Sequence, residues 1–168
     1  YRCDLTLTGP LIAGLATVAG FAFMGKNIVN VWPIFIGGYI YCRYTRVSFG
    51  SIMTPILFAT TLAPAASQIA LGLGMNYMFS IPLGILTGLI VGFVVVPLSK
   101  QVVHFHDGYN LYNIGFTGGL IGTIIGSLLF GFGLVFETQS VLSTEYHVFL
   151  RNISIFIFSL YILIGFGM

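Results

Sequence analysis

The chain has 168 residues, of which 57% are hydrophobic and only 6% are charged, and its mean hydropathy is +1.02. A soluble domain carries about 25% charged residues, so this composition excludes a soluble enzyme, a nucleic-acid binder and a disordered linker together. The sequence predicts an integral membrane protein whose main partner is the lipid bilayer, with no nucleic-acid partner. The net charge of +2 comes from six basic and four acidic residues and indicates no polyanionic partner.

Charge-free intervals predict the membrane spans, because a helix needs about 20 apolar residues to cross about 30 Å of hydrocarbon. Runs such as Val94-Val95-Val96 do not alternate in polarity, which argues against a transmembrane β-barrel. We expect an all-α polytopic transmembrane helix bundle with about five spans plus a broken or re-entrant segment. The expected segments are residues 5–25, 27–42, 51–73 (broken), 79–98, 108–136 and 152–168.

Residues 51–73 carry polar side chains inside an apolar run, together with Pro55 and Pro64, which interrupt a helix. Unpaired polar groups are not tolerated in lipid, so this segment must lie against protein or a water-filled cavity. We favour re-entry over spanning, because transporters place broken helices and their binding sites near the bilayer midplane. The residues expected to line a solute pathway here are Thr54, Thr60, Thr61, Ser67 and Gln68.

A short sequence pattern occurs twice in the chain. Residues 8–12 and 117–121 share four of five positions, which is either coincidence in a Gly- and Leu-rich chain or the mark of two homologous halves. The halves would cover residues 5–98 and 113–168 within one transmembrane domain, 1–168, that we expect to be a piece of a longer chain. A re-entrant 51–73 segment makes the two copies inverted, whereas a spanning one makes them parallel.

Glycines spaced four apart occur in two of the expected spans. In lipid, such ridges of small residues let helix backbones approach closely. We therefore expect helix packing at two ridges, within the same chain or against a second copy: Gly84, Gly88 and Gly92, and Gly118, Gly122 and Gly126.

The longest polar stretch between two spans runs from Lys100 to Asn113 and has three interpretations. His104, His106 and Asp107 offer imidazole and carboxylate groups for a metal, but residues two apart on a helix point away from each other, so we expect no metal. The same three residues are candidates for a proton relay. The interpretation that we favour is a connector at the membrane interface.

Amide and hydroxyl groups continue from this stretch into the next span. Asn110, Asn113 and Thr117 lie three and four residues apart and are expected to form one stripe along a solute pathway. Lys26, at the end of the first span, is interpreted as an anchor that snorkels to the interface.

Three phrases of the sequence resemble a known family. They are residues 23–27 (FMGKN), 60–64 (TTLAP) and 104–119 (HFHDGYNLYNIGFTGG). They are similar to an uncharacterised family of bacterial multi-spanning membrane proteins, a domain of unknown function. The resemblance implies a bacterial inner-membrane location, but it does not indicate an activity, because the family has no established substrate. The small-residue repeats also faintly resemble the half-repeats of urea transporters, but residues 62–64 lack the flanking pattern that would carry urea-lining residues over.

The leading functional hypothesis is a multi-pass permease or channel-like carrier for a small polar solute. One alternative is an intramembrane enzyme that uses His104, His106 and Asp107. No His-Glu-x-x-His or Gly-x-Ser-x-Gly motif is present, so we assign no catalytic residue and no cofactor. The other alternative is a structural subunit whose polar stripe contacts a second copy or the remainder of the same chain.

Overall fold

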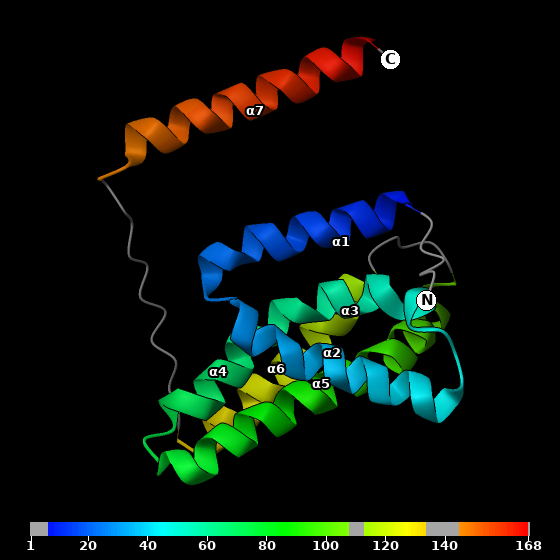
Figure 1. Ribbon diagram of the computed structural model, residues 1–168, viewed down its shortest axis with the longest axis vertical. Helices are drawn as coiled ribbons and strands as arrows, with labels where there is room; N and C mark the ends of the chain where they lie inside the picture. Colours follow the sequence, from blue (N-terminus) through cyan, green and yellow to red (C-terminus); the bar gives the residue numbers. More distant parts are fainter. Residues whose placement is uncertain (1–6, 108–112, 134–144, 168) are drawn as a thin grey trace. The chain divides into compact units, whose positions relative to one another are not determined.

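The computed structural model describes residues 7–107, 113–133 and 145–167, which contain α-helices, short 3-10 helices and no strand (Figure 1). The chain divides into two compact units, Tyr1–Val135 and Phe136–Met168. The first unit holds α1 (Gly9–Gly20), η1 (Phe21–Met24), α2 (Ile28–Thr45), η2 (Phe49–Ile52), α3 (Met53–Ala59), η3 (Thr60–Leu62), α4 (Ala63–Gly72), α5 (Tyr77–His106) and α6 (Asn113–Gly131). The second unit holds α7 (His147–Gly167).

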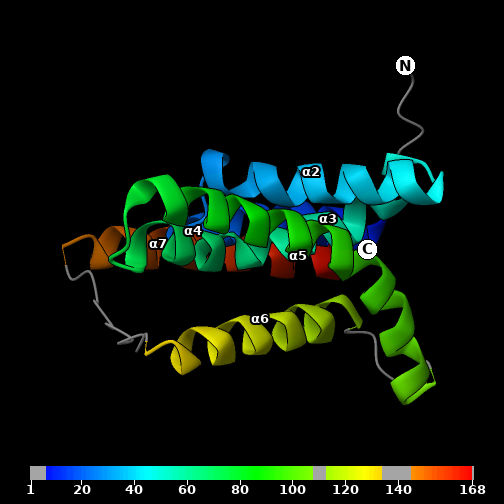
Figure 2. The ribbon, with the colours of Figure 1, turned by 90° about the horizontal axis from the view of Figure 1, so that it is seen from below.

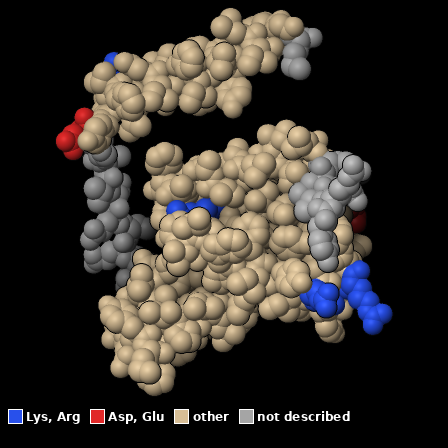
Figure 3. Space-filling view, viewed as in Figure 1, with Lys and Arg blue, Asp and Glu red and all other residues tan. Residues whose placement is uncertain are grey.

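Four helical segments are long and apolar enough to cross a membrane. They are Phe49–Gly72, Tyr77–Phe105, Asn113–Gly131 and His147–Gly167, and Gly9–Met24 is a shorter apolar helix. Helix α2, expected from the sequence as a short span, is not among the four. The all-α membrane class is confirmed, and the surface in Figure 3 is correspondingly almost free of charge. The protein is a multi-pass membrane protein.

The helix over residues 49–72 is interrupted in its middle by the 3-10 turn η3. Pro64 has no N–H group for the carbonyl of Thr60, four residues earlier, so the α-helical bond is lost. The N–H of Ala63 donates to that carbonyl instead, in the i to i+3 pattern of a 3-10 helix. The break expected from Pro64 is therefore present, and the freed carbonyl is satisfied within the segment.

This broken segment runs in one direction along α2 and does not fold back. Its first part packs against the C-terminal half of α2, where a Cβ at Gly38 would meet Ile52 and Ile56. Its second part lies beside the start of α2, where Asn30 donates to Ser67. A re-entrant hairpin would bring both ends to the same level of α2, so the re-entry favoured from the sequence is wrong and the spanning alternative describes this fold.

Successive elements of the first unit alternate in direction as a result. In Figures 1 and 2, α1, the broken segment and α6 run one way, whereas α2 and α5 run the other way. The first copy of the repeated pattern, at Thr8, opens α1, and the second copy, at Thr117, lies in α6. These two helices run in the same direction. An inverted repeat is therefore not present in this unit, and any relation between the two copies is parallel.

Helix α5 is the longest element and extends beyond the apolar layer. Its 30 residues span about 45 Å at 1.5 Å per residue, compared with about 30 Å of hydrocarbon. Lys100 and His104 lie in its last turns, beyond the Pro97 that stands inside the helix. Figure 2 shows the helix bending toward this end, as a helix-interior proline requires.

Glycines allow α2 and α5 to pack backbone to backbone. A Cβ at Gly92 would overlap the carbonyl oxygen of Ile34, and one at Gly37 would overlap the carbonyl oxygen of Leu89. Gly88 faces Pro33 in the same contact, whereas Gly84 faces Ala66 and Ala70 of α4. The ridge on α5 thus contacts α2 and α4.

The second glycine ridge, on α6, makes little contact within the described chain. Gly122 lies near Leu62, but a Cβ at Gly118 or Gly126 would meet no neighbouring atom within 4 Å. Packing along this ridge stays a prediction.

Replacing Gly92 with alanine should destabilise the first unit. The added Cβ overlaps backbone and not the end of a flexible side chain, so the two helices must move apart, with an expected loss of about 1–3 kcal/mol in the free energy of unfolding. Denaturation of the purified protein in detergent, followed by circular dichroism, measures this loss. Gly126→Ala is the matched control and should be neutral or stabilising, since alanine is the better helix former. Equal effects of the two substitutions would contradict the close approach.

Candidate functional site

A lysine is buried where the α1–α2 connection meets the broken span. The Lys26 side chain is only 5% exposed. Its Nζ donates to the hydroxyl of Thr60 at 2.7 Å and to the carbonyl of Thr17 at 3.4 Å, and it lies 5.4 Å from the centroid of the Phe21 ring. Lysine has three N–H donors, and these two oxygens are its acceptors among the described residues.

The position of Thr60 places this amino group near the middle of a candidate membrane span. Thr60 is the twelfth residue of the 24-residue candidate span Phe49–Gly72 and is fully buried. Its hydroxyl also donates to the carbonyl of Leu57 at 2.6 Å. The ammonium group of Lys26 therefore sits about midway along a helix that is long enough to cross the membrane.

Asn30 makes a second polar link between the same two elements. Its Nδ2 donates to the hydroxyl of Ser67 at 2.9 Å and to the carbonyl of Gly25 at 2.9 Å. We call Lys26, Asn30, Thr60 and Ser67, with the carbonyls of Thr17 and Gly25, the Lys26 cluster. Together, the two side-chain bonds fasten Lys26 to the break in the span, at Thr60, and the start of α2 to the part after the break, at Ser67.

The local sequence explains why Lys26 points inward. Gly25 has φ 87, a left-handed conformation that glycine adopts without strain, and it turns the chain sharply after η1. Asn27 then caps α2, because its side chain accepts from the N–H groups of Val29 and Asn30 while Asn30 accepts from the N–H of Asn27. Lys26 is held between the turn and the cap, and the snorkelling orientation expected from the sequence is wrong.

The charge of Lys26 has no carboxylate partner in the described part of its unit. Asp107 is the single acidic residue there, and it ends α5 with an exposed side chain. The interactions that hold the ammonium group are a hydroxyl, a carbonyl and an aromatic face. A cation of this kind inside an apolar layer usually marks a solute or ion pathway.

Comparisons with known proteins place the chain in a family. The model of a family described as a protein of unknown function, DUF1576, matches residues 1–130. The chain belongs to this family. The matched region includes the whole Lys26 cluster, and it confirms the resemblance to a family of unknown function that the sequence phrases suggest. No curated protein and no solved structure matches the chain.

The polar residues expected in the broken segment of this DUF1576 member are only partly brought together. Thr60, in the break, and Ser67, in α4 after it, join the Lys26 cluster. Thr61 is half-buried and donates to the carbonyl of Phe58 at 2.8 Å. Thr54 is half-buried and Gln68 is exposed, and neither belongs to the cluster.

The stripe expected on α6 lies away from this cluster. Thr117 is fully buried, and its hydroxyl donates to the carbonyl of Asn113, one turn earlier in the same helix, at 2.8 Å. Asn113 begins α6 and is half-buried. Asn110 lies outside the described residues.

The His104, His106 and Asp107 group lies at the far end of α5. His104 is exposed, the side chain of His106 is outside the described part, and Asp107 ends the helix in a left-handed conformation with φ 47. Within the described residues, no group of three or more His, Cys, Asp and Glu side chains is placed to hold a metal ion.

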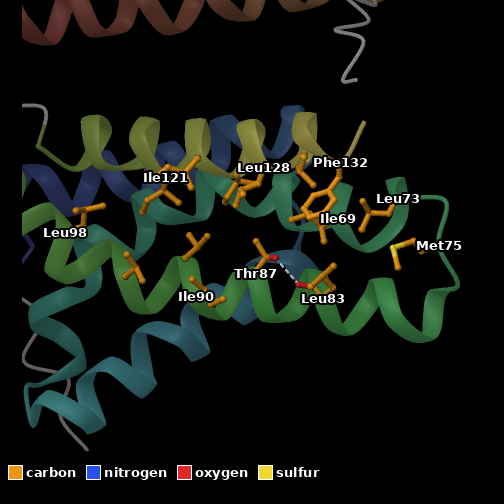
Figure 4. Close-up of a pocket in the computed structure, with 15 residues that line it drawn as sticks. Ile69, Leu73, Met75, Leu83, Thr87, Ile90, Leu98, Ile121, Leu128 and Phe132 are labelled. Atoms are coloured by element: carbon orange, nitrogen blue, oxygen red, sulfur yellow. Dashed lines mark hydrogen bonds between the residues drawn. The ribbon is translucent and has the colours of Figure 1, made fainter. Parts of the chain in front are cut away.

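A large groove lies between α4, α5 and α6, and it is apolar. Its volume is about 800 Å³. Figure 4 shows side chains of α5, such as Ile90, and of α6, such as Ile121, pointing toward one another across it. Thr87 is the one hydroxyl-bearing residue among those described in its lining, and it donates to the carbonyl of Leu83. Among the described residues that were expected to line a solute pathway, none lies in this groove.

The sequence analysis missed Lys26 as part of a site. The available signal was the spacing of Lys26, Asn27 and Asn30 at the start of a helix, directly after a glycine. The sequence around a lysine near the end of an apolar run can be the same whether its side chain snorkels outward or turns inward. This signal alone therefore does not distinguish the two orientations.

Removing the hydroxyl of Thr60 should destabilise the protein. In Thr60→Val the buried ammonium group keeps a single acceptor, and we expect the free energy of unfolding to fall by about 1–3 kcal/mol. Thr60→Ser retains the hydroxyl, so its free energy of unfolding should fall by less. Thr123→Val serves as a background control, because the Thr123 hydroxyl is exposed and bonds only within its own helix. Similar losses for Val and Ser at position 60 would show that the Lys26 bond is not what stabilises this region.

Proposed function

We propose that this DUF1576 protein is a permease or channel-like carrier for a small polar solute, with the Lys26 cluster as its binding centre. The observation that supports this proposal is an ammonium group buried midway along a candidate span without a described carboxylate partner. The cluster offers N–H donors from Lys26 and Asn30 and hydroxyl groups from Thr60 and Ser67. Such groups suit a small solute that accepts hydrogen bonds.

Energetic considerations favour a functional over a structural role for Lys26. A lysine at the centre of a membrane helix costs about 2.5–3.5 kcal/mol on the insertion scale. A packing role would be filled at lower cost by an apolar side chain of similar length, since replacing buried charges with apolar groups is often neutral or stabilising. Retention of the ammonium group is therefore expected where its charge or its donors are used.

Solute access requires the cluster to open. Thr60 and Lys26 are close-packed, and two side-chain bonds, Lys26 to Thr60 and Asn30 to Ser67, close the break in the span. We infer that this is a closed state. Separation of the α1–α2 connection from η3, about the turn at Gly25, would expose the donors to a solute.

A structural subunit without a pathway is the second candidate function. The observations that favour it are the apolar lining of the groove between α4, α5 and α6 and the satisfied hydroxyls of Thr61 and Thr117. Under this alternative, the Lys26 cluster only locks the α1–α2 connection to the broken span, and no solute crosses.

Solute flux in proteoliposomes separates the two candidates. Stopped-flow light scattering would follow the uptake of three probes: urea, glycerol and potassium formate. We expect at least one probe to enter faster than into protein-free vesicles, and Lys26→Met to return that rate to the protein-free value, because the substitution keeps the length of the side chain and removes its charge and donors.

Arg151→Gln is the control for this assay, because Arg151 is exposed on α7 and takes no part in the cluster. Its flux should equal that of the wild type. Protein-free rates for all three probes with the wild-type chain would favour the structural subunit.

A further inference from the structure

A second cavity, which unlike the apolar groove is polar, lies at the C-terminal end of α2 and is independent of the proposed carrier function. Its volume is about 460 Å³. The described residues that line it are Tyr39, Cys42, Arg43, Arg46, Val47 and Phe49. Two of them carry guanidinium groups and none is acidic.

The two arginines line the same cavity although they repel each other. Arg43 lies in the last turn of α2 and Arg46 directly follows the helix, so the lining of one cavity carries two like charges. An anion between them would convert this repulsion into attraction, and planar guanidinium groups match the oxygens of phosphate in a bidentate manner.

The backbone at Arg46 supports the same conclusion. Arg46 ends α2 in the left-handed conformation, with φ 59, where glycine is the usual residue. Helix-dipole compensation accounts for Arg43 in the last turn, but it does not require an arginine in a strained position. The strain places a second guanidinium group on the cavity.

The walls of the cavity are ordered by local contacts. The thiol of Cys42 donates to the carbonyl of Ser48 at 3.7 Å, which holds the link after α2 against the helix. The rings of Tyr39 and Phe49 meet edge to face, with centroids 6.3 Å apart. The cavity is therefore an open hollow with aromatic and basic walls, on which the side chains of Tyr39, Arg43 and Arg46 are exposed.

The level of the cavity identifies the source of the anion. Phe49 lines the cavity and is also the first residue of the candidate span Phe49–Gly72. The arginines thus lie where the apolar layer ends, which is the level of lipid headgroups. We propose that Arg43 and Arg46 bind the phosphate group of an anionic membrane lipid in this cavity.

Lipid binding by the full chain tests the proposal. Native mass spectrometry in detergent would compare dioleoyl phosphatidic acid with dioleoylglycerol, which has the same acyl chains and no phosphate. We expect tighter binding of phosphatidic acid, and an affinity about ten-fold or more weaker in the double variant R43Q/R46Q, because both charge-assisted contacts are lost. Equal binding of the two lipids by the wild-type chain would overturn the proposal.

Three further arms complete the test. R43K/R46K keeps both charges and should fold even where R43Q/R46Q does not. Its affinity for phosphatidic acid should be lower than that of the wild-type chain, because lysine lacks the bidentate fork. An affinity equal to that of the wild-type chain would overturn the site. R151Q removes an arginine near the start of α7 and is the control, so it should bind phosphatidic acid as tightly as the wild-type chain does. A loss of affinity equal to that of R43Q/R46Q would show that binding depends on overall charge and not on this site, and would overturn the proposal. Displacement of the lipid by millimolar inorganic phosphate would assign the cavity to free phosphate and overturn the lipid assignment.

Discussion

The hydrogen bond from Lys26 to Thr60 is the interaction on which the centre of this membrane domain depends. A broken helix inside an apolar layer leaves polar groups that water cannot reach, and each must find a partner in the protein. Thr60 lies at the break and receives the ammonium group of a lysine 34 residues earlier. This contact gives the buried ammonium group an acceptor, while the carbonyl freed at the break is satisfied within the segment by the N–H of Ala63.

Close packing of α2 against α5 is what makes this contact possible. Gly37 and Gly92 let the two backbones touch, and this fixes the position of α2 beside the broken span. Asn30, near the start of α2, then lies level with Ser67. The apolar part of the same assembly is a core in which Ile34, Ile56 and Val95 are fully buried. Small residues and polar residues therefore have complementary roles: the first set the distance between helices and the second set their register.

Much of the fold follows from the sequence, because composition and proline positions act locally. The membrane class, the long helices and the break before Pro64 need only the apolar runs and the missing N–H of proline. The direction of the broken segment does not follow in this way. Its polar groups suggested a water-filled cavity, but Lys26 and Asn30 of a distant segment satisfy them. The pairing of Lys26 with Thr60 and of Asn30 with Ser67 cannot be found by considering one segment at a time. The orientation of Lys26 was predicted wrongly for the same reason.

The contrast between the apolar groove beside α6 and the polar Lys26 cluster bears on how a carrier of this kind would work. The groove beside α6 is wide but lined by side chains such as Ile90 and Leu128, so a polar solute would gain no hydrogen bonds there. The Lys26 cluster has the donors but is closed. A pathway therefore needs motion at the α1–α2 connection, where the bonds from Lys26 to Thr60 and from Asn30 to Ser67 would have to break. A solute that accepts hydrogen bonds from Lys26 and Asn30 would replace the bonds that are lost, which is the condition for binding and opening to be coupled.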